Sequence, residues 1–309
     1  KIMVALDMTE LNISYAIDHG VDMVISHHPF LFKPIHDIDL STCKGRMIEN
    51  LIRHRITSFA AHTNLDSAVQ GVNDALAEKL GLQECKGFVP VMTYSSYKFT
   101  LYITAAHAKL LKKKLDSLRG KDIESYYVVD DADDFTENIR VEFRVPGQLV
   151  KQVKDMISSL DKSAKYDVYK LVNHGYKETM GRIGKFPFPM SVEEALSYIK
   201  NKLEIPVLRY AGNRDRLVEK IAILGGAGAE FAEVAKSMGA DLYLTGDLKY
   251  HEAQDAAMNG LVIADGGHFY TERVIIPYLA KRLRDEFKTR GWNVGVLEDV
   301  RAKDIFHCV

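Results

Sequence analysis

The sequence predicts an α/β fold in which two similar α/β halves form one discontinuous domain, with a smaller α+β module inserted between them. Three observations support this prediction. Short apolar runs alternate with helical stretches over about the first 90 residues, and the alternation returns after Ser191. Continuous apolar strands between helices are typical of a mostly parallel sheet covered on both faces. Between the two regions, strands of alternating polarity replace the continuous apolar runs.

The first half begins with a predicted strand over residues 2–6. A helix follows, which Thr9 caps and Gly20 ends. A second buried strand over 23–25 leads into a loop that opens with His27-His28-Pro29. The remaining elements predicted here are a helix over 44–53, a strand over 56–60 and a helix over 72–80.

The middle of the chain predicts a small α+β sandwich of the ferredoxin-like type. Residues 97–103 and 140–145 alternate like half-exposed strands, and a Lys-rich helix lies between them. Pro146 opens another helix, and 166–172 reads as the closing strand, so one strand of the ferredoxin-like pattern is not recognisable. A linker rich in Gly and Pro follows. The predicted domains are therefore 1–95 with 190–309, and an inserted module with its linker over 96–189.

The second half repeats the strand and helix alternation. A strand over 221–224 runs into Gly225-Gly226-Ala227-Gly228, which either cradles an anion at the next helix or forms a tight turn with close helix packing. Further strands are predicted over 242–244 and 261–264, and the second leads to Gly266-Gly267-His268 and a long final helix.

The two halves share a pattern that suggests duplication. Residues 20–26 and 239–245 both read Gly, small residue, Asp, three apolar residues and a hydroxyl residue. The next strand in each half is followed by a histidine and, four residues later, an acid: His62 with Asp66, and His268 with Glu272. Chance similarity between ordinary βα units is the alternative interpretation.

Composition argues against several classes of function. The 309 residues contain 41 Lys and Arg against 42 Asp and Glu, a formal net charge of −1, which offers no overall electrostatic drive toward nucleic acid. Three widely spaced cysteines without a CxxC pair support neither a cysteine zinc site nor a disulfide framework, and they fit a reducing, cytoplasmic setting. No apolar run approaches the ~18–20 residues of a membrane span.

Histidines and acids gather at predicted strand ends, where open α/β sheets carry their functional crevice. His27 and His28 follow one strand, His62 the next, and His268 a third. Imidazoles with carboxylates are typical ligands of zinc, iron or manganese. Adjacent histidines suit two ions, one for each ring, and two ions ~3.5–4 Å apart with a bridging carboxylate can ionise a water for hydrolysis.

Structural roles are the alternative for each of these residues. His62 could merely order the Asp66 turn, and Glu272 could be an acid favoured by the helix dipole. Asp247 and His251 follow a fourth strand end, where they are candidate proton carriers, together with His62, or capping residues.

Four spaced motifs occur in the α/β regions: ISHHPFLFKP (25–34), AHTNLD (61–66), LTGDLKYH (244–251) and GHFYTE (267–272). In this order they resemble the Nif-three-like dinuclear metal-centre family, whose members are also named GTP cyclohydrolase I type 2 homologues. The resemblance implies metal ligands at His27, His28, Asp66, His268 and Glu272, with Glu272 as the bridge and His62 near the metals. It also implies a hexameric ring of identical subunits and a middle domain similar to nitrogen-regulatory signalling proteins.

The sequence therefore predicts a protein with two divalent ions per subunit, zinc first, with manganese or iron as alternatives. The expected activity is metal-dependent hydrolysis of a nucleotide or other phosphorylated small molecule, for which GTP ring opening is the first candidate. The alternative is a non-catalytic, metal-loaded regulatory or scaffold assembly, or a metal chaperone. Neither interpretation includes a membrane, and a nucleic-acid partner ranks last.

Overall fold

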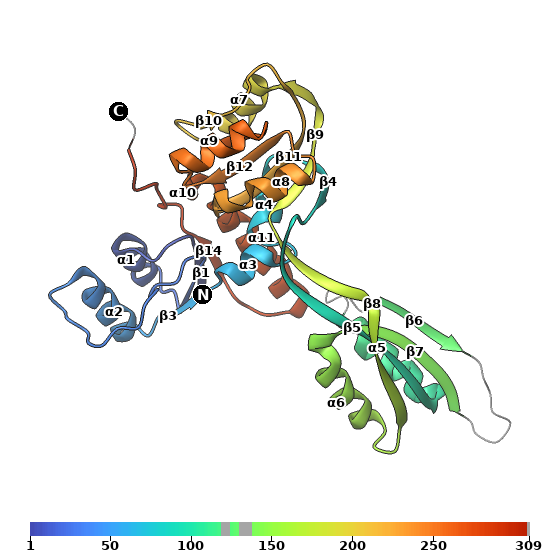
Figure 1. The fold of residues 1–309 in the computed structure, drawn as a ribbon. Coiled ribbons are helices and arrows are strands. Elements are labelled where there is room, and N and C mark those ends of the chain that lie inside the picture. Colours follow the sequence, from blue (N-terminus) through green and yellow to red (C-terminus); the bar gives the residue numbers. More distant parts are fainter. Residues whose placement is uncertain (119–123, 130–137, 308–309) are drawn as a thin grey trace. The chain divides into compact units, whose positions relative to one another are not determined.

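The structure is a computed structural model that describes residues 1–118, 124–129 and 138–307. The chain forms two compact units, drawn in Figure 1. Lys1–Val89 and Thr179–Val309 together make the α/β unit, and Pro90–Glu178 makes the inserted unit.

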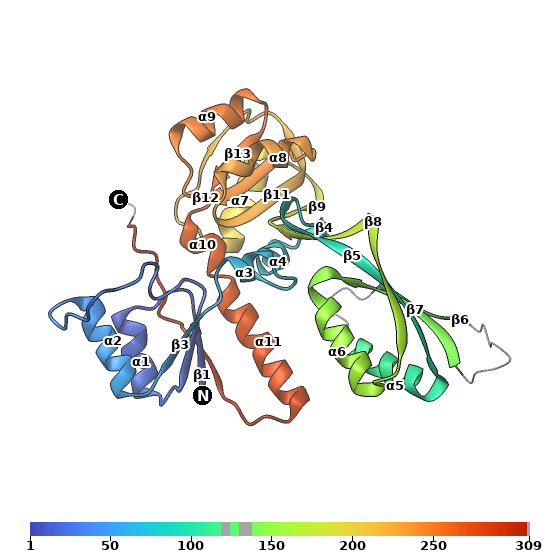
Figure 2. The ribbon, with the colours of Figure 1, turned by 60° about the horizontal axis from the view of Figure 1, so that its bottom comes forward.

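A parallel sheet of order β14-β1-β2-β3 forms one part of the α/β unit. Its strands and covering helices are β1 (Ile2–Ala5), β2 (Met23–Ser26), β3 (Thr57–Ala60), β14 (Val296–Glu298), α1 (Glu10–Asp18), α2 (Cys43–Arg53), α4 (Val72–Lys79) and α11 (Ile275–Arg290). Met3 and Ala5 of β1 face α1 and α2, whereas Val4 and the following Leu6 face α4 and α11. Because alternate residues of a strand point to opposite faces, both faces of this sheet are covered. Figure 2 shows α11 across the sheet from α1 and α2.

A mixed sheet of order β10-β13-β12-β11-β9-β4 forms the other part of this unit. The strands are β4 (Gln83–Lys86), β9 (Arg182–Ser191), β10 (Arg209–Ala211), β11 (Leu217–Ala227), β12 (Leu242–Gly246) and β13 (Val262–Asp265). β11, β12 and β13 run parallel, and β4, β9 and β10 pair antiparallel with their neighbours. Helix α7 (Val192–Leu203) covers one face, and α8 (Ala232–Ser237) and α9 (Tyr250–Met258) cover the other.

The stretch interpreted from sequence as a Gly- and Pro-rich linker is strand β9 within this sheet. Lys185 pairs with Lys220 and Met190 with Val218, and the register shifts between these two pairs. Pro187 and Pro189 lie at that irregularity, where a residue that cannot donate a backbone hydrogen bond is tolerated.

Helix α4 joins the two sheets into one core. Val72 and Ala75 pack with α11 against the parallel sheet, whereas Leu76 and Leu80 pack with α7 against the mixed sheet. The short helix α10 (His268–Glu272) contacts β11 and β12. The ends of β2, β3 and β13 are thereby brought around one place.

The inserted unit has the element order β-α-β-β-α-β and a sheet of order β6-β7-β5-β8. Its elements are β5 (Val89–Thr104), α5 (Ala105–Asp116), β6 (Glu124–Val129), β7 (Asn138–Pro146), α6 (Val150–Leu160) and β8 (Lys165–Met180). Phe99 and Phe143 stack at the centre of its core, against Leu111 of α5 and Ile157 of α6. β6 is the strand that the sequence did not reveal.

The predicted mixed α/β character is confirmed, with both parallel and antiparallel pairing. Strands β1-β2-β3 and β11-β12-β13 adjoin in the same order, the arrangement that a duplication requires, although duplication itself stays a prediction. Across the described residues, no helix combines the length and apolar character needed to cross a bilayer.

Candidate metal centre

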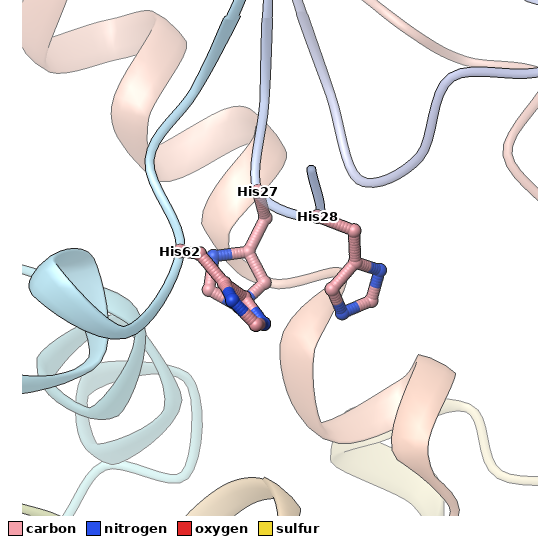
Figure 3. A group of neighbouring side chains, drawn as sticks. All are labelled: His27, His28 and His62. Atoms are coloured by element: carbon pink, nitrogen blue, oxygen red, sulfur yellow. The ribbon is translucent and has the colours of Figure 1, made fainter. Parts of the chain in front are cut away.

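The candidate site forms where strands β2 and β3 end. The backbone amides of His27 and His28 donate to the carbonyls of Ala5 (3.1 Å) and Leu6 (2.9 Å), which continues the β1–β2 pairing past the ends of the strands. Figure 3 shows the rings of His27 and His28 leaving the loop after β2, beside that of His62 from the loop after β3. The three ring centroids lie 5.0–5.7 Å apart. The sheet therefore places three predicted residues side by side.

His27 belongs to a buried group with Asp66 and Glu272. Its Nδ1 donates to the carbonyl of Ala61 (2.9 Å), so the lone pair of the imidazole is on Nε2. Nε2 lies 3.5 Å from Asp66 Oδ1 and 3.6 Å from Glu272 Oε1. Nε2 of His27 and Oδ1 of Asp66 are buried without any hydrogen-bond partner, which is costly unless another group satisfies them. A bound cation would satisfy both atoms.

His28 and His268 form a second group with the same Glu272. Their Nε2 atoms are 3.3 Å apart, and Glu272 Oε2 lies 2.9 Å from the first and 3.1 Å from the second. Oε2 is also among the buried side-chain atoms that have no hydrogen-bond partner. Two imidazoles and a carboxylate directed at one point are a ligand set for a divalent ion.

The carboxylate of Glu272 lies directly beside the backbone of Gly226, where there is no room for a side chain. A Cβ at Gly226, whose φ is +69°, would lie 2.2 Å from Glu272 Oε1 and 3.2 Å from His268 Nε2. The amide of Gly226 donates to Thr271 Oγ1 (3.0 Å), so the glycine-rich end of β11 is tied to α10. The sequence offered two interpretations of residues 225–228, an anion cradle and a tight turn with close helix packing. The second agrees with the position of these glycines beside the cluster.

Asp66 lies on the short helix α3 (Thr63–Ser67) and is held through its backbone. Asn73, buried in α4, donates from Nδ2 to the Asp66 carbonyl (2.9 Å) and accepts from the amide of Gly225 (3.0 Å). The Asn73 side chain thus links the short helix that carries Asp66 to the glycine-rich end of β11, which lies beside Glu272.

Electrostatics of the cluster show a strong coupling between acids and imidazoles. Burial works to lower the pKa of His28, but the carboxylates of Asp7 and Glu272 outweigh it and raise the pKa to about 10. The Glu272 carboxylate likewise raises the pKa of His268 to about 9. Burial alone would raise the pKa of Glu272, but the imidazoles around it hold that pKa well below its usual range. Burial raises the pKa of Asp66 to about 6.

Two further carboxylates accept hydrogen bonds from the Nδ1 atoms of His28 and His268, the nitrogens that face away from Glu272. Asp7 Oδ1 accepts from His28 Nδ1 and Asp247 Oδ2 accepts from His268 Nδ1, both at 2.7 Å. Asp247 was singled out from sequence, whereas Asp7 was missed. The available signal was its place just after the first strand, the position that His27 and His28 occupy after the second.

Of the other two candidate proton carriers, His62 belongs to the cluster and His251 does not; His27, His28 and His62 form a third group whose nitrogens could hold an ion. His62 is partly exposed, and burial together with the neighbouring imidazoles of His27 and His28 lowers its pKa. Its ring packs edge-on against Phe32, with centroids 5.8 Å apart. His251 lies on the exposed side of α9 beside Tyr250, and it belongs to none of the metal-binding groups found among the described residues.

A cavity of about 640 Å³ in the α/β unit is lined by residues of α4, α11 and the segment after β14. Arg273 lines it, but none of the cluster residues does. The candidate site is therefore identified by its donor atoms and not by the volume of a cavity.

The chain is similar to known proteins over nearly its whole length. A family model described as Duf34/NIF3 (NGG1p interacting factor 3) matches residues 1–303. Proteins named GTP cyclohydrolase 1 type 2 homolog from Halalkalibacterium halodurans and Bacillus subtilis are each 32% identical, with 99% and 96% of this chain and 88% and 86% of the relatives covered. A crystal structure of a Bacillus cereus protein related to NIF3 has a TM-score of 0.88 at 32% identity, covering 100% of this chain and 89% of that one.

Proposed function

This chain belongs to the Duf34/NIF3 family, and from that premise we propose that its α/β unit is a two-metal hydrolase for a nucleotide or another phosphorylated small molecule. The observation that carries the proposal is the orientation of Glu272. One carboxylate oxygen faces His27 and the other faces His28 and His268. A single bridging carboxylate between two ligand groups is the arrangement expected of a dinuclear centre.

The proposed ligands divide into two positions that share Glu272. His27, Asp66 and Oε1 of Glu272 would hold the first ion. His28, His268 and Oε2 of Glu272 would hold the second. Nitrogen and oxygen donors without sulfur suit zinc first, with manganese and iron as alternatives.

Divalent ions held in these two positions would supply Lewis acidity and would lower the pKa of a water molecule into the physiological range. The residues of the chain orient the ligands and move protons. His62 stands at the rim of the cluster, and its lowered pKa leaves it neutral and able to accept a proton near pH 7. Asp247 can take part through His268, to which it is hydrogen-bonded. The relatives' name makes GTP the first substrate to assay.

The proposal extends to the organisation of the whole chain. The expected form is a homo-oligomer, a hexameric ring, as the motif resemblance implies. The β-α-β-β-α-β order of the inserted unit supports a ferredoxin-like module placed within a discontinuous, duplicated α/β domain. Sedimentation velocity of the purified chain would measure the oligomeric state.

Metal analysis combined with turnover assays tests the hydrolase. The wild-type chain should contain about two ions per subunit, as a two-metal site requires, and should convert GTP or a member of a panel of phosphorylated small molecules. The double variant His28→Ala, Glu272→Ala should lose both metal and turnover. The matched control His54→Ala, Glu286→Ala changes an exposed histidine and an exposed glutamate away from the cluster and should lose neither.

Two outcomes contradict this proposal in different ways. Turnover that survives in the double variant removes the cluster from catalysis. Bound metal without turnover on the whole panel contradicts the hydrolase and leaves a metal-loaded scaffold or metal chaperone as the function of the cluster.

A further inference from the structure

Asp7, just beyond the end of β1, contacts the cluster from outside the two ligand groups. We propose that Asp7 is a positioning residue for the second metal position and acts through His28. The inference rests on the proposed dinuclear centre and deepens it. The contact that carries it is the 2.7 Å hydrogen bond from His28 Nδ1 to Asp7 Oδ1.

This hydrogen bond determines which nitrogen of His28 can bind a metal ion. A carboxylate accepts the Nδ1 hydrogen, so Nδ1 carries the proton and the lone pair is on Nε2. Nε2 is the atom that faces His268 Nε2 and Glu272 Oε2. Without Asp7, either tautomer could form and the ring could turn about its side-chain bonds. Asp7 therefore selects both the tautomer and the orientation needed at the second position.

The backbone of Asp7 is itself held in place by a buried residue. Asn12, which is 2% exposed, donates from Nδ2 to the Asp7 carbonyl (2.6 Å) and to Asp299 Oδ2 (3.0 Å). Asn12 also completes the capping box of α1 with Thr9. The position of Asp7 is thus fixed by the start of one helix and by the segment that follows β14.

Asp247 makes the corresponding contact on the other ring of the same group. Its Oδ2 accepts from His268 Nδ1 at 2.7 Å, and its backbone has a φ of +55°, which is uncommon for a residue with a side chain. Strained backbone of this kind persists where the surrounding structure requires it and is concentrated at functional sites. Both outer carboxylates therefore act on the group formed by His28, His268 and Glu272.

The two metal positions differ in where their negative charge lies. At the first position Asp66 belongs to the ligand group directly, and His27 donates its outer hydrogen to the neutral carbonyl of Ala61. At the second position the only carboxylate in the ligand group is the shared Glu272. Asp7 and Asp247 supply charge there through the imidazoles, which makes each ring a stronger donor.

A competition titration of the full chain with Zn²⁺ and a chromophoric chelator tests the role of Asp7. Asp7→Ala should weaken one of two bound zinc ions by about 10- to 100-fold and leave the other unchanged, as loss of an outer-shell partner does. Asp7→Asn keeps an oxygen that can accept the hydrogen bond and should recover part of the loss. The absorption spectrum of the Co²⁺-loaded chain should change in Asp7→Ala, because the geometry at one ion changes. Asp18→Ala removes an exposed acid of α1 and should alter none of these readouts.

The outcomes separate this inference from the proposed function. Two zinc ions bound as tightly by Asp7→Ala as by wild type, with an unchanged cobalt spectrum, overturn the role of Asp7 and leave the dinuclear centre standing. If the wild-type chain binds fewer than two ions, both the role of Asp7 and the dinuclear centre are overturned. Metal-bound wild type that hydrolyses nothing, together with the expected loss in Asp7→Ala, overturns only the hydrolase. If Asp7→Ala does not fold, the same comparison is made with Asp7→Ser, whose hydroxyl is too short to take the place of the carboxylate, and equal zinc affinity and an equal cobalt spectrum overturn the role.

Discussion

Glu272 is the residue on which both metal positions depend, because each of its carboxylate oxygens faces a different ligand group. Glu272→Gln keeps the shape of the side chain and removes its charge. Metal affinity should fall at both positions, by more than the about 10- to 100-fold typical of losing an outer partner. Metal content after dialysis, measured by mass spectrometry, checks this. Glu286→Gln on the exposed side of α11 is the control, and loss at one position only would contradict the bridge.

Gly226 should tolerate no side chain, because a Cβ would lie 2.2 Å from Glu272 Oε1. Gly226→Ala also places alanine at positive φ, at a cost of roughly 1–2 kcal/mol. Both metal affinity and thermal stability should therefore fall. Gly20→Ala is a matched control, because Gly20 has a φ of +60° and a Cβ there would meet no described atom within 4 Å beyond its chain neighbours. It should lower the unfolding temperature and leave metal affinity unchanged; equal affinity in both variants would exclude the clash.

Proton release should accompany metal uptake. The neighbouring carboxylates raise the pKa of His28 to about 10 and that of His268 to about 9, so this pair of rings holds an additional proton near pH 7 in the metal-free chain. Metal binding must displace this proton, so affinity should rise with pH. Calorimetry in two buffers of different ionisation enthalpy measures the protons released, and identical apparent enthalpies would contradict the prediction. In the metal-free chain, the stabilisation from these rings is complete below about pH 6.5 and lost as pH rises through 9–10.

Helix α4 connects two neighbouring elements through Asn73, whose side chain links α3 to β11. Asn73→Leu leaves the amide of Gly225 and the carbonyl of Asp66 without their partner, which should cost about 1–3 kcal/mol for each buried group left unsatisfied. Chemical denaturation measures this cost. Metal affinity should fall at the first position, where Asp66 lies, and a stability loss without any change in affinity would show that Asn73 does not orient Asp66.

The sequence predicts elements well where the hydrophobic period is long or a strand is continuously apolar. β2, β11 and β12 stand out for that reason, and α1 begins at the predicted cap Thr9. Helix α7, which Ser191 caps, was not among the predicted elements. β14 has three residues, too few for a periodic signal, and its pairing with β1 joins distant parts of the chain. β6 includes the exposed Tyr127 and Val128, so it lacks the buried alternation that reveals a strand.

The predicted ligand residues come from two sheets and not from one edge of a single sheet, because His268 and Glu272 follow β13 of the mixed sheet. Only the histidines that follow β2 and β3 are brought together by neighbouring strand ends. His27, His28 and His62 follow adjacent strands, so their proximity could be inferred. Asp7 also follows a strand end, but an Asp before a Thr cap looks like ordinary helix-start chemistry, so it was not singled out. Its role depends on a contact across 21 residues that no spacing rule predicts. The metal-ligand roles themselves stay predictions until an ion is measured.

Metal loading should stabilise the α/β unit as a whole, since the ligands come from both of its sheets. A metal ion that binds only the folded chain adds about 2.7 kcal/mol when its concentration is 100 times the dissociation constant. The unfolding temperature should therefore rise by several degrees in excess Zn²⁺ and fall in chelator, as scanning calorimetry can measure. The Glu272→Gln variant should show no such dependence. A metal-independent unfolding temperature in the wild type would contradict a shared centre.

The pairing of β1 with β14 has a consequence for how the protein matures. The first strand of the chain finds one of its two neighbours only after residues 296–298 have been made, and the two histidines of the second group are 240 residues apart. While the polypeptide is still emerging from the ribosome, the sheet is incomplete and its ligands are separated, because contacts this distant in sequence form late. Acquisition of metal at both positions is therefore expected only after His268 and Glu272 have been made. A chain that stalls before its last strand leaves His27 and His28 without a finished site.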